Sequence, residues 1–354
     1  MKIAVVLYNL GGPDKPDDVQ PFLFNLFNDP MIIGAPGPIR WLLAKLISSR
    51  RAPVARKIYQ HLGGGSPLLE NTRAQAEALE SALSASGGDD YRVFVAMRYW
   101  HPKVDAVARD VKAYAPDRIV LLPLYPQYST TTVGSFLRVW QRAERSIGLD
   151  CPTQSICCYP TEPGFVSANA AALRSALQNV DEGKRVRVLF SAHGLPKKII
   201  DGGDPYRWQV EQTAKAVVDE LGLNDLDWLN CYQSRVGPLE WIGPSTEDEI
   251  RRAGAEGLAV VIVPLAFVSE HSETLVELDI EYRQIADAIG VAGYHRVPTV
   301  SISQPFIAGL ARLVSVAVSD TPSPCNGSGG RICPDQWPQC PCTAGEASDN
   351  GRSA

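Results

Sequence analysis

The sequence predicts an α/β fold with two similar domains, each built around a parallel sheet that has helices on both faces. The chain has 354 residues, enough for two domains at the common size of roughly 150 residues. Short runs rich in Val, Ile and Leu alternate with stretches of helical composition, and strands that alternate with helices form parallel sheets. Apolar residues make up 45% of the chain and charged residues 21%, as in a folded protein with a buried core.

Eight apolar runs are expected to be buried strands, four in each half of the chain. The spacers between them are expected to be helices, for example residues 71–80. A turn-like segment at 159–164 predicts an N-terminal domain over 1–162 and a C-terminal domain over 163–303. We expect residues 304–320 to return to the first domain and residues 321–354 to form a cysteine-rich extension. The predicted strands span 2–10, 91–99, 117–124, 153–159, 185–191, 227–232, 259–267 and 297–303.

Charge and hydropathy exclude several classes of protein. The net charge of −5 argues against nucleic acid as a partner, because proteins that bind it present a basic surface. No apolar stretch reaches the ~18 residues of a membrane-spanning helix, and the first residues lead directly into a strand pattern instead of a signal peptide. We therefore expect a cytoplasmic protein, in which clustered cysteines bind metal more readily than they form disulfides.

Polar and aromatic side chains follow the predicted strands. Arg98 and Tyr99 come after the second strand, Tyr125 after the third, His193 after the fifth and His271 after the seventh. Open parallel sheets bind ligands at the carboxyl ends of their strands. Two such edges that face one another would form a cleft between the domains, which is a favoured place for a ligand.

The two strand-end histidines are accompanied by carboxylates. A histidine at a strand end is often a structural, hydrogen-bonded residue, but its place at the ligand edge makes a catalytic role for His193 an equal alternative. If a helix begins near Ser269, four glutamates three or four residues apart share one stripe of it. That stripe is either a solvated face or a route for protons or metal ions to a site near His271. Its members are Glu270, Glu273, Glu277 and Glu281.

Residues 21–50 form a long apolar insertion between the first strand and a glycine-rich turn at 63–68. The insertion is too long for a simple strand-to-helix connection. Its side chains either join the core or form an apolar lip with a basic rim, suited to a flat apolar ligand or a membrane surface. The glycine-rich turn matches neither the phosphate-loop nor the dinucleotide pattern, so we interpret it as a turn that lets the backbone approach a ligand. The basic residues near the insertion are Lys45, Arg50, Arg51 and Arg56.

The composition changes after Asp320 to Pro, Gly, Ser and Cys. Cys333, Cys340 and Cys342 lie close together there, in a spacing that no standard zinc finger has. Three thiolates in a short segment favour a soft metal or an iron–sulfur cluster, with structural zinc as the alternative. A fourth ligand would come from Cys151, Cys157, Cys158 or Cys325.

Several short motifs occur in a fixed order along the chain, at 9–13, 63–68, 97–99, 122–129, 191–196, 203–206, 232–238 and 267–282. Together they resemble the ferrochelatase family, whose members insert ferrous iron into protoporphyrin IX. The resemblance covers nearly the whole chain to about residue 320. It implies two Rossmann-like domains, each with a four-stranded parallel sheet, and a porphyrin cleft between them.

The resemblance also implies roles for single residues. His193, His271 and Glu273 would be catalytic as Fe²⁺ enters the ring to give haem and two protons leave. His193 and Glu273 would bind the Fe²⁺ substrate, and Glu270, Glu277 and Glu281 would form the route for protons or metal. The residues that bind the porphyrin would be Arg98, Tyr99, Ser66, Tyr125 and Phe267.

Some members of the family carry a [2Fe–2S] cluster on a C-terminal cysteine extension, and the resemblance implies one here. Animal members have a cluster cysteine where this chain has Thr130, so the ligands must differ. We expect Cys158, Cys333, Cys340 and Cys342, with Cys157 and Cys151 as competitors for the place of Cys158. The segment 21–50 would form a lip around protoporphyrin and touch the inner membrane peripherally. Two alternatives are a chelatase for coproporphyrin or sirohydrochlorin and a non-catalytic porphyrin or haem carrier.

Overall fold

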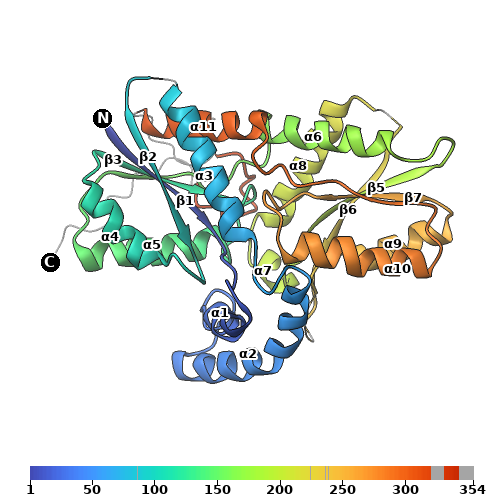
Figure 1. Cartoon of the computed structure of the whole chain (residues 1–354), viewed down its shortest axis with the longest axis horizontal. Coiled ribbons are helices and arrows are strands. Elements are labelled where there is room, and N and C mark those ends of the chain that lie inside the picture. The colour runs from blue at the N-terminus through green and yellow to red at the C-terminus, as the bar shows by residue number, and fades with distance from the viewer. Residues whose placement is uncertain (86, 224, 236, 238, 320–330, 343–354) are drawn as a thin grey trace.

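The computed structural model describes residues 1–85, 87–223, 225–235, 237, 239–319 and 331–342. Within them the chain forms two four-stranded parallel sheets flanked by helices, which confirms the predicted fold class. The strand orders are β2-β1-β3-β4 and β6-β5-β7-β8, and Figure 1 shows the two sheets beside one another. The strands are β1 (Lys2–Asn9), β2 (Asp90–Met97), β3 (Arg118–Pro123), β4 (Thr153–Ser155), β5 (Val186–His193), β6 (Asp227–Gln233), β7 (Ala259–Pro264) and β8 (Tyr294–Arg296).

The first sheet is covered on both faces because alternate residues of a strand point to opposite sides. Ile3, Val5 and Leu7 of β1 pack against one pair of helices, α3 (Leu68–Ala85) and α11 (Gln304–Val318). Ala4, Val6 and Tyr8 pack with the other pair, α4 (Val104–Tyr114) and α5 (Val133–Ile147).

The second sheet repeats this arrangement. On one face, Val188 and Phe190 of β5 pack with α6 (Pro163–Gln178) and α8 (Tyr206–Leu221), and the short α7 (Lys197–Asp201) follows β5 on this side. On the other face, Leu189 packs with α9 (Thr246–Ala255), a π-helix η2 (Glu273–Glu281) and α10 (Tyr282–Ala288). Helix α11 contacts α3 of the first half and α6 of the second, so it joins the two halves. The domain limits drawn from the sequence stay predictions.

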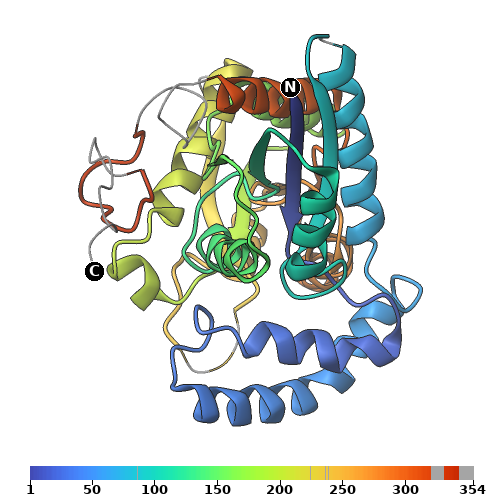
Figure 2. The ribbon, with the colours of Figure 1, turned by 90° about the vertical axis from the view of Figure 1, so that its left-hand side faces the viewer.

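The apolar insertion folds into helices that lie apart from both sheets. A short 3₁₀ turn, η1 (Pro16–Asp18), leads into α1 (Val19–Phe27) and the long α2 (Gly37–Gln60). Figure 2 shows α1 and α2 side by side below the sheets. Part of this segment is buried in a small core of its own, but α2 leaves large apolar side chains exposed. The exposed side chains are Ile39, Trp41, Leu42, Leu46 and Val54.

None of the helices in the described part of the chain combines the length and the apolarity that a membrane crossing requires.

Two predicted elements were placed wrongly. The last strand is at Tyr294–Arg296 instead of 297–303. The apolar run after it contains Pro298, which lacks the N–H that a ladder needs, and it folds back so that Ser301 N donates to the Val268 carbonyl. The helix expected from Ser269 begins only at Glu273 and is a π-helix.

Candidate active site

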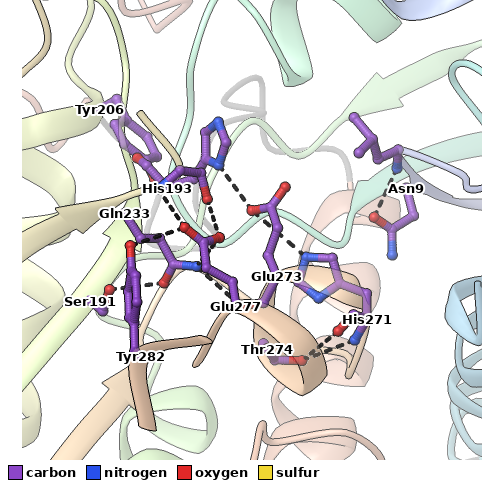
Figure 3. A network of polar contacts seen from close by, with 12 residues as sticks. Asn9, Ser191, His193, Tyr206, Gln233, His271, Glu273, Thr274, Glu277 and Tyr282 are labelled. Carbon is purple, nitrogen blue, oxygen red and sulfur yellow. Dashed lines mark hydrogen bonds and ion pairs between the residues drawn. The ribbon is translucent and has the colours of Figure 1, made fainter. Parts of the chain in front are cut away.

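The carboxyl ends of β5 and β6 bring His193 beside Gln233, with which it is paired in the sheet. From β5 the imidazole reaches the start of the π-helix, where His193 Nδ1 lies 2.9 Å from Glu273 Oε2. Figure 3 shows His193, Glu273 and His271 in a row, with Glu273 in the middle. His271 Nε2 lies 4.0 Å from the same carboxylate oxygen.

His193 lies deep in the protein and is still accessible. Burial is the largest single effect on its pKa and lowers it, but the Glu273 carboxylate outweighs burial and the pKa is raised above its usual 6.5. Even so, 38% of the His193 side chain and 27% of that of Glu273 are exposed. A group that is surrounded by protein and yet open to solvent lines a concave surface, as a ligand-binding residue does.

His271 has the opposite electrostatic character. Burial lowers the pKa of His271 below 6.5, so His271 is the weaker base of the two histidines. Glu273 is held as an anion because its histidine neighbours outweigh burial and lower its pKa well below the usual range. The site therefore combines a carboxylate with two imidazoles of different basicity.

Glu277 lies behind Glu273 and is saturated with hydrogen-bond donors. Its Oε1 accepts from Ser234 N at 2.8 Å and from the Tyr282 hydroxyl at 3.0 Å. Its Oε2 accepts from Ser234 Oγ at 2.6 Å and from Gln233 Nε2 at 3.1 Å. Burial and the charge of Glu273 nevertheless raise the pKa of Glu277. Two neighbouring carboxyl groups whose pKa values are pushed apart are suited to proton transfer.

The other two glutamates of the predicted stripe lie elsewhere. Glu270 precedes the π-helix, and its carboxylate pairs with Arg296 Nη1 at 2.9 Å and accepts from Thr299 N at 3.0 Å. Glu281 ends the π-helix and is exposed. The structure thus brings Glu273 and Glu277 together, engages Glu270 with a cation and leaves Glu281 at the surface.

Arg98 and Tyr99, expected to bind substrate, converge on a residue that the sequence did not single out. Asp29, between α1 and α2, is buried, and its Oδ2 accepts from Arg98 Nη2 at 2.7 Å and from the Tyr99 hydroxyl at 2.6 Å. Ser135 of α5 donates to the same oxygen. Because these partners lie 69 to 106 residues from Asp29 in the sequence, no local pattern could have revealed the cluster. These bonds to Asp29 hold the insertion against the end of β2.

Residues of the first half also approach Glu273. Burial raises the pKa of Tyr59 on α2 and of Tyr125 after β3, and the charge of Glu273 raises both further.

The other two residues expected to bind substrate are Phe267 and Ser66. The centre of the Phe267 ring lies 4.7 Å from that of the His271 ring. Ser66 N donates to the Pro13 carbonyl at 2.8 Å. This turn needs glycine before Ser66, since a Cβ at Gly65 would lie 2.3 Å from the Asp14 carbonyl oxygen.

Comparison with known proteins agrees with this geometry. A family model described as Ferrochelatase matches residues 2–318. The chain belongs to the ferrochelatase family. A curated ferrochelatase from Caulobacter vibrioides is 53% identical over 348 residues, covering 98% of this chain and 99% of the relative. One from Pelagibacter ubique is 49% identical over 344 residues, covering 97% and 99%.

Among solved structures, SirB from Bacillus subtilis with Fe³⁺ has a TM-score of 0.53 at 11% identity, covering 90% of this chain and 96% of that one. At this identity the likeness concerns the fold alone. Membership of the ferrochelatase family confirms the resemblance found in the sequence. The chain is therefore a metal chelatase, a lyase, with ferrous iron as a substrate.

Among the described residues, no three His, Cys, Asp or Glu side chains are arranged to hold a metal ion. This holds for the His193–Glu273–His271 row and for the described cysteines of the predicted cluster alike. Transient contact with iron in transit needs fewer ligands, and imidazole nitrogen and carboxylate oxygen both bind divalent iron.

Five cysteines of this ferrochelatase are buried together on the α5 side of the first sheet: Cys157, Cys158, Cys333, Cys340 and Cys342. Gln209 Nε2 of α8 lies 3.4 Å from Cys158 Sγ and 3.1 Å from Cys333 Sγ. A hydrogen bond between Cys333 and Cys340 lowers the pKa of Cys340 and raises that of Cys333. Cys342 is in a disulfide.

Cys151 lies outside this group. It precedes β4, and its Sγ donates to the Pro116 carbonyl beside the start of β3, whereas Cys157 and Cys158 follow the other end of β4. Between them the chain pairs with β3 from Pro152 to Ile156, four steps of ~3.3 Å or about 13 Å, so Cys151 and Cys157 are too far apart to share a ligand set. Cys325 lies outside the described residues.

Proposed function

We propose that the chain inserts Fe²⁺ into protoporphyrin IX, giving haem and releasing two protons. The observation that carries this proposal is the pairing of His193 with Glu273 at an accessible edge of the second sheet, with His271 on the other side of Glu273. Metallation needs groups that bind a divalent ion and groups that accept protons, and this row can do both.

In the proposed mechanism, His193 and Glu273 bind the arriving Fe²⁺. As the metal passes to the ring, the bond between iron and His193 breaks and a bond from iron to a pyrrole nitrogen forms, and the freed His193 nitrogen accepts the proton that this pyrrole N–H loses. Glu273 stabilises the imidazolium through its hydrogen bond to Nδ1. The second proton passes to the carboxylates, from Glu273 to Glu277 and then to the exposed Glu281. The raised pKa of Glu277 supports its place in this route. Glu270, paired with Arg296, helps to hold the site without carrying protons.

The proposed porphyrin site lies between these residues and the insertion, with Arg98, Tyr99, Ser66, Tyr125 and Phe267 around it. The apolar side chains of α1 and α2 favour protoporphyrin over coproporphyrin or sirohydrochlorin, which carry more carboxylates and cost more to desolvate. We therefore expect kcat/KM for anaerobic Fe²⁺ insertion to be highest with protoporphyrin. A higher kcat/KM with either competitor, measured under the same conditions, would overturn this choice of substrate.

We also propose that the enzyme is cytoplasmic and touches the inner membrane peripherally through α2. The exposed Ile39, Leu42 and Leu46 lie three or four residues apart on one face of α2, and Arg50 adds positive charge near them. Such a face binds anionic lipid surfaces. Co-flotation with anionic vesicles, lost in a variant with Leu42→Ser and Leu46→Ser, is the expected result. Unchanged flotation of that variant would contradict it.

We propose further that Cys158, Cys333, Cys340 and Cys342 hold a [2Fe–2S] cluster. The four side chains are buried in one core but are not arranged as a closed metal site. Their shared burial supports the proposal, as does the donor Gln209, because hydrogen bonds to sulfur stabilise bound thiolates. The Cys342 disulfide would have to be reduced before its sulfur could bind iron. A bound cluster would supply a one-electron redox centre and tie the extension to the first sheet.

Substitution of Cys158 tests the cluster. Protein purified without oxygen is expected to contain acid-labile sulfide and to absorb visible light, and Cys158→Ser is expected to lose both. Cys151→Ser is the matched control and should keep both, because its sulfur lies at the far end of β4. Wild-type protein without sulfide, or Cys158→Ser with a full complement, would contradict the proposed ligand set.

A further inference from the structure

The segment that carries His271 belongs to no regular element. Strand β7 ends at Pro264 and the π-helix starts at Glu273, so residues 265–272 lie between regular elements and are tied to them only at their ends, where Leu265 N donates to the Ser191 carbonyl and the His271 carbonyl accepts from Leu275 N. The stretch between these ends depends on side-chain and turn contacts, which act together with the bonds between the His271 backbone and Thr274 to set where the His271 ring lies relative to Glu273. A displacement of about 1 Å at a reacting group can cost up to about a hundredfold in rate, so these contacts matter.

A glutamine from the other half of the molecule makes three side-chain hydrogen bonds to this segment and to the loop that packs beside it. Gln75 of α3 is fully buried, and its Nε2 donates to the carbonyls of Val268 at 2.9 Å and Ser301 at 3.0 Å. Its Oε1 accepts from Ser269 Oγ at 2.8 Å. Both ends of the amide are therefore used, which fixes its orientation. A buried amide that is fully bonded specifies one arrangement of its partners.

The neighbouring turn of α3 extends the same contact. Asn71, four residues before Gln75 and on the same face, donates through Nδ2 to the Glu270 carbonyl at 2.9 Å. Between them, Thr72 Oγ1 accepts from Asn9 Nδ2 at 3.3 Å, at the end of β1. One face of α3 thus bonds to the ligand edge of the first sheet and to the residues just before His271.

The loop that contains Ser301, the third hydrogen-bond partner of Gln75, has a strained backbone at that residue. Ser301 has a φ of +44°, a left-handed conformation that favours glycine and strains a residue with a side chain. Its carbonyl accepts from Gln75 and its N–H donates to Val268, whose carbonyl is the other Gln75 acceptor. Gln75 is thus the common partner of both loops on which His271 rests.

We propose that Gln75, assisted by Asn71, is a positioning residue that fixes His271 against Glu273. It touches neither porphyrin nor iron, and it acts across the junction of the two halves. The proposal rests on the catalytic role proposed above for His271. Its consequence is that the placement of His271 depends on how the first half of the molecule packs against the second.

Gln75→Met keeps the length of the side chain and removes all three bonds. The expected result is a fall in kcat of about tenfold or more, with the KM for porphyrin within about twofold, because Phe267 alone among the proposed porphyrin contacts adjoins this segment. Glu77→Gln, on an exposed position of the same helix, is the matched control and should leave both unchanged. Thermal unfolding shows which variants are folded. If Gln75→Met does not fold, Asn71→Ala, at a half-buried position, takes its place.

A double-mutant cycle with His271→Ala separates positioning from a general structural effect. If Gln75 acts through His271, Gln75→Met should lower kcat in the wild-type background and change it little in His271→Ala. Equal falls in both backgrounds, or a wild-type kcat in Gln75→Met, would overturn the proposal. A wild-type rate in His271→Ala alone would instead overturn the proposed role of His271, so the two failures are distinguishable.

Discussion

Replacing His193 by alanine is expected to lower kcat for Fe²⁺ insertion by about a hundredfold to ten-thousandfold, the usual range for loss of a positioned acid–base group. His193 is the accessible member of the row at the end of β5, and its Nδ1 contacts Glu273 at 2.9 Å. The variant loses both the proton acceptor and a nitrogen ligand for iron. Porphyrin binding, measured by fluorescence quenching, should change by no more than a few-fold.

His101→Gln is the control for this variant. His101 is exposed, and its ring lies edge-on to that of the neighbouring Trp100. Because it is not part of the His193–Glu273–His271 row, its replacement should leave kcat unchanged. Equal rates for His193→Ala and the wild-type enzyme, with both folded, would remove His193 from the mechanism.

Replacing Glu273 by glutamine is expected to slow insertion and to shift its pH dependence. Only neutral His193 accepts a proton, so kcat/KM rises as pH increases through the pKa of His193. In the wild-type enzyme that pKa is raised above 6.5, because the Glu273 charge outweighs the effect of burial. Glutamine removes the charge and leaves burial, which lowers the pKa. The acid limb of the pH profile should therefore move to lower pH as the maximal rate falls by at least about tenfold.

Glu247→Gln makes the same change of charge at the exposed start of α9, where Glu247 pairs with Arg251, and should leave the limb in place. If the acid limb of the pH profile does not shift in Glu273→Gln, or if it shifts to higher pH, then Glu273 does not set the protonation of His193.

The sequence predicted the sheets because strand composition is a local property. Buried parallel strands are apolar throughout, and the runs at 2–10 and 259–267 overlap β1 and β7. The last strand was predicted at the wrong place because the apolar run at 297–303 packs and supports a loop instead of joining the sheet. The actual strand, Tyr294–Arg296, has a polar composition. Composition alone does not separate these two uses.

The site was predictable as far as it follows strand ends. His193 directly ends β5, and His271 with Glu273 lies in the connection after β7. The glutamate stripe was drawn on an α-helix from Ser269, and the start of a π-helix at Glu273 is a tertiary effect, common at functional sites, that the spacing does not encode. Asp29 and Gln75 were missed because each is defined by partners far away in the sequence.

The central claim is that an imidazole at position 193 takes part directly in metal insertion, and chemical rescue tests it most directly. Free imidazole added to folded, porphyrin-binding His193→Ala should raise the rate of Fe²⁺ insertion in a saturable way, and more strongly at pH values where imidazole is neutral. A rate that does not depend on imidazole at any pH, in a variant that binds porphyrin normally, would contradict the account.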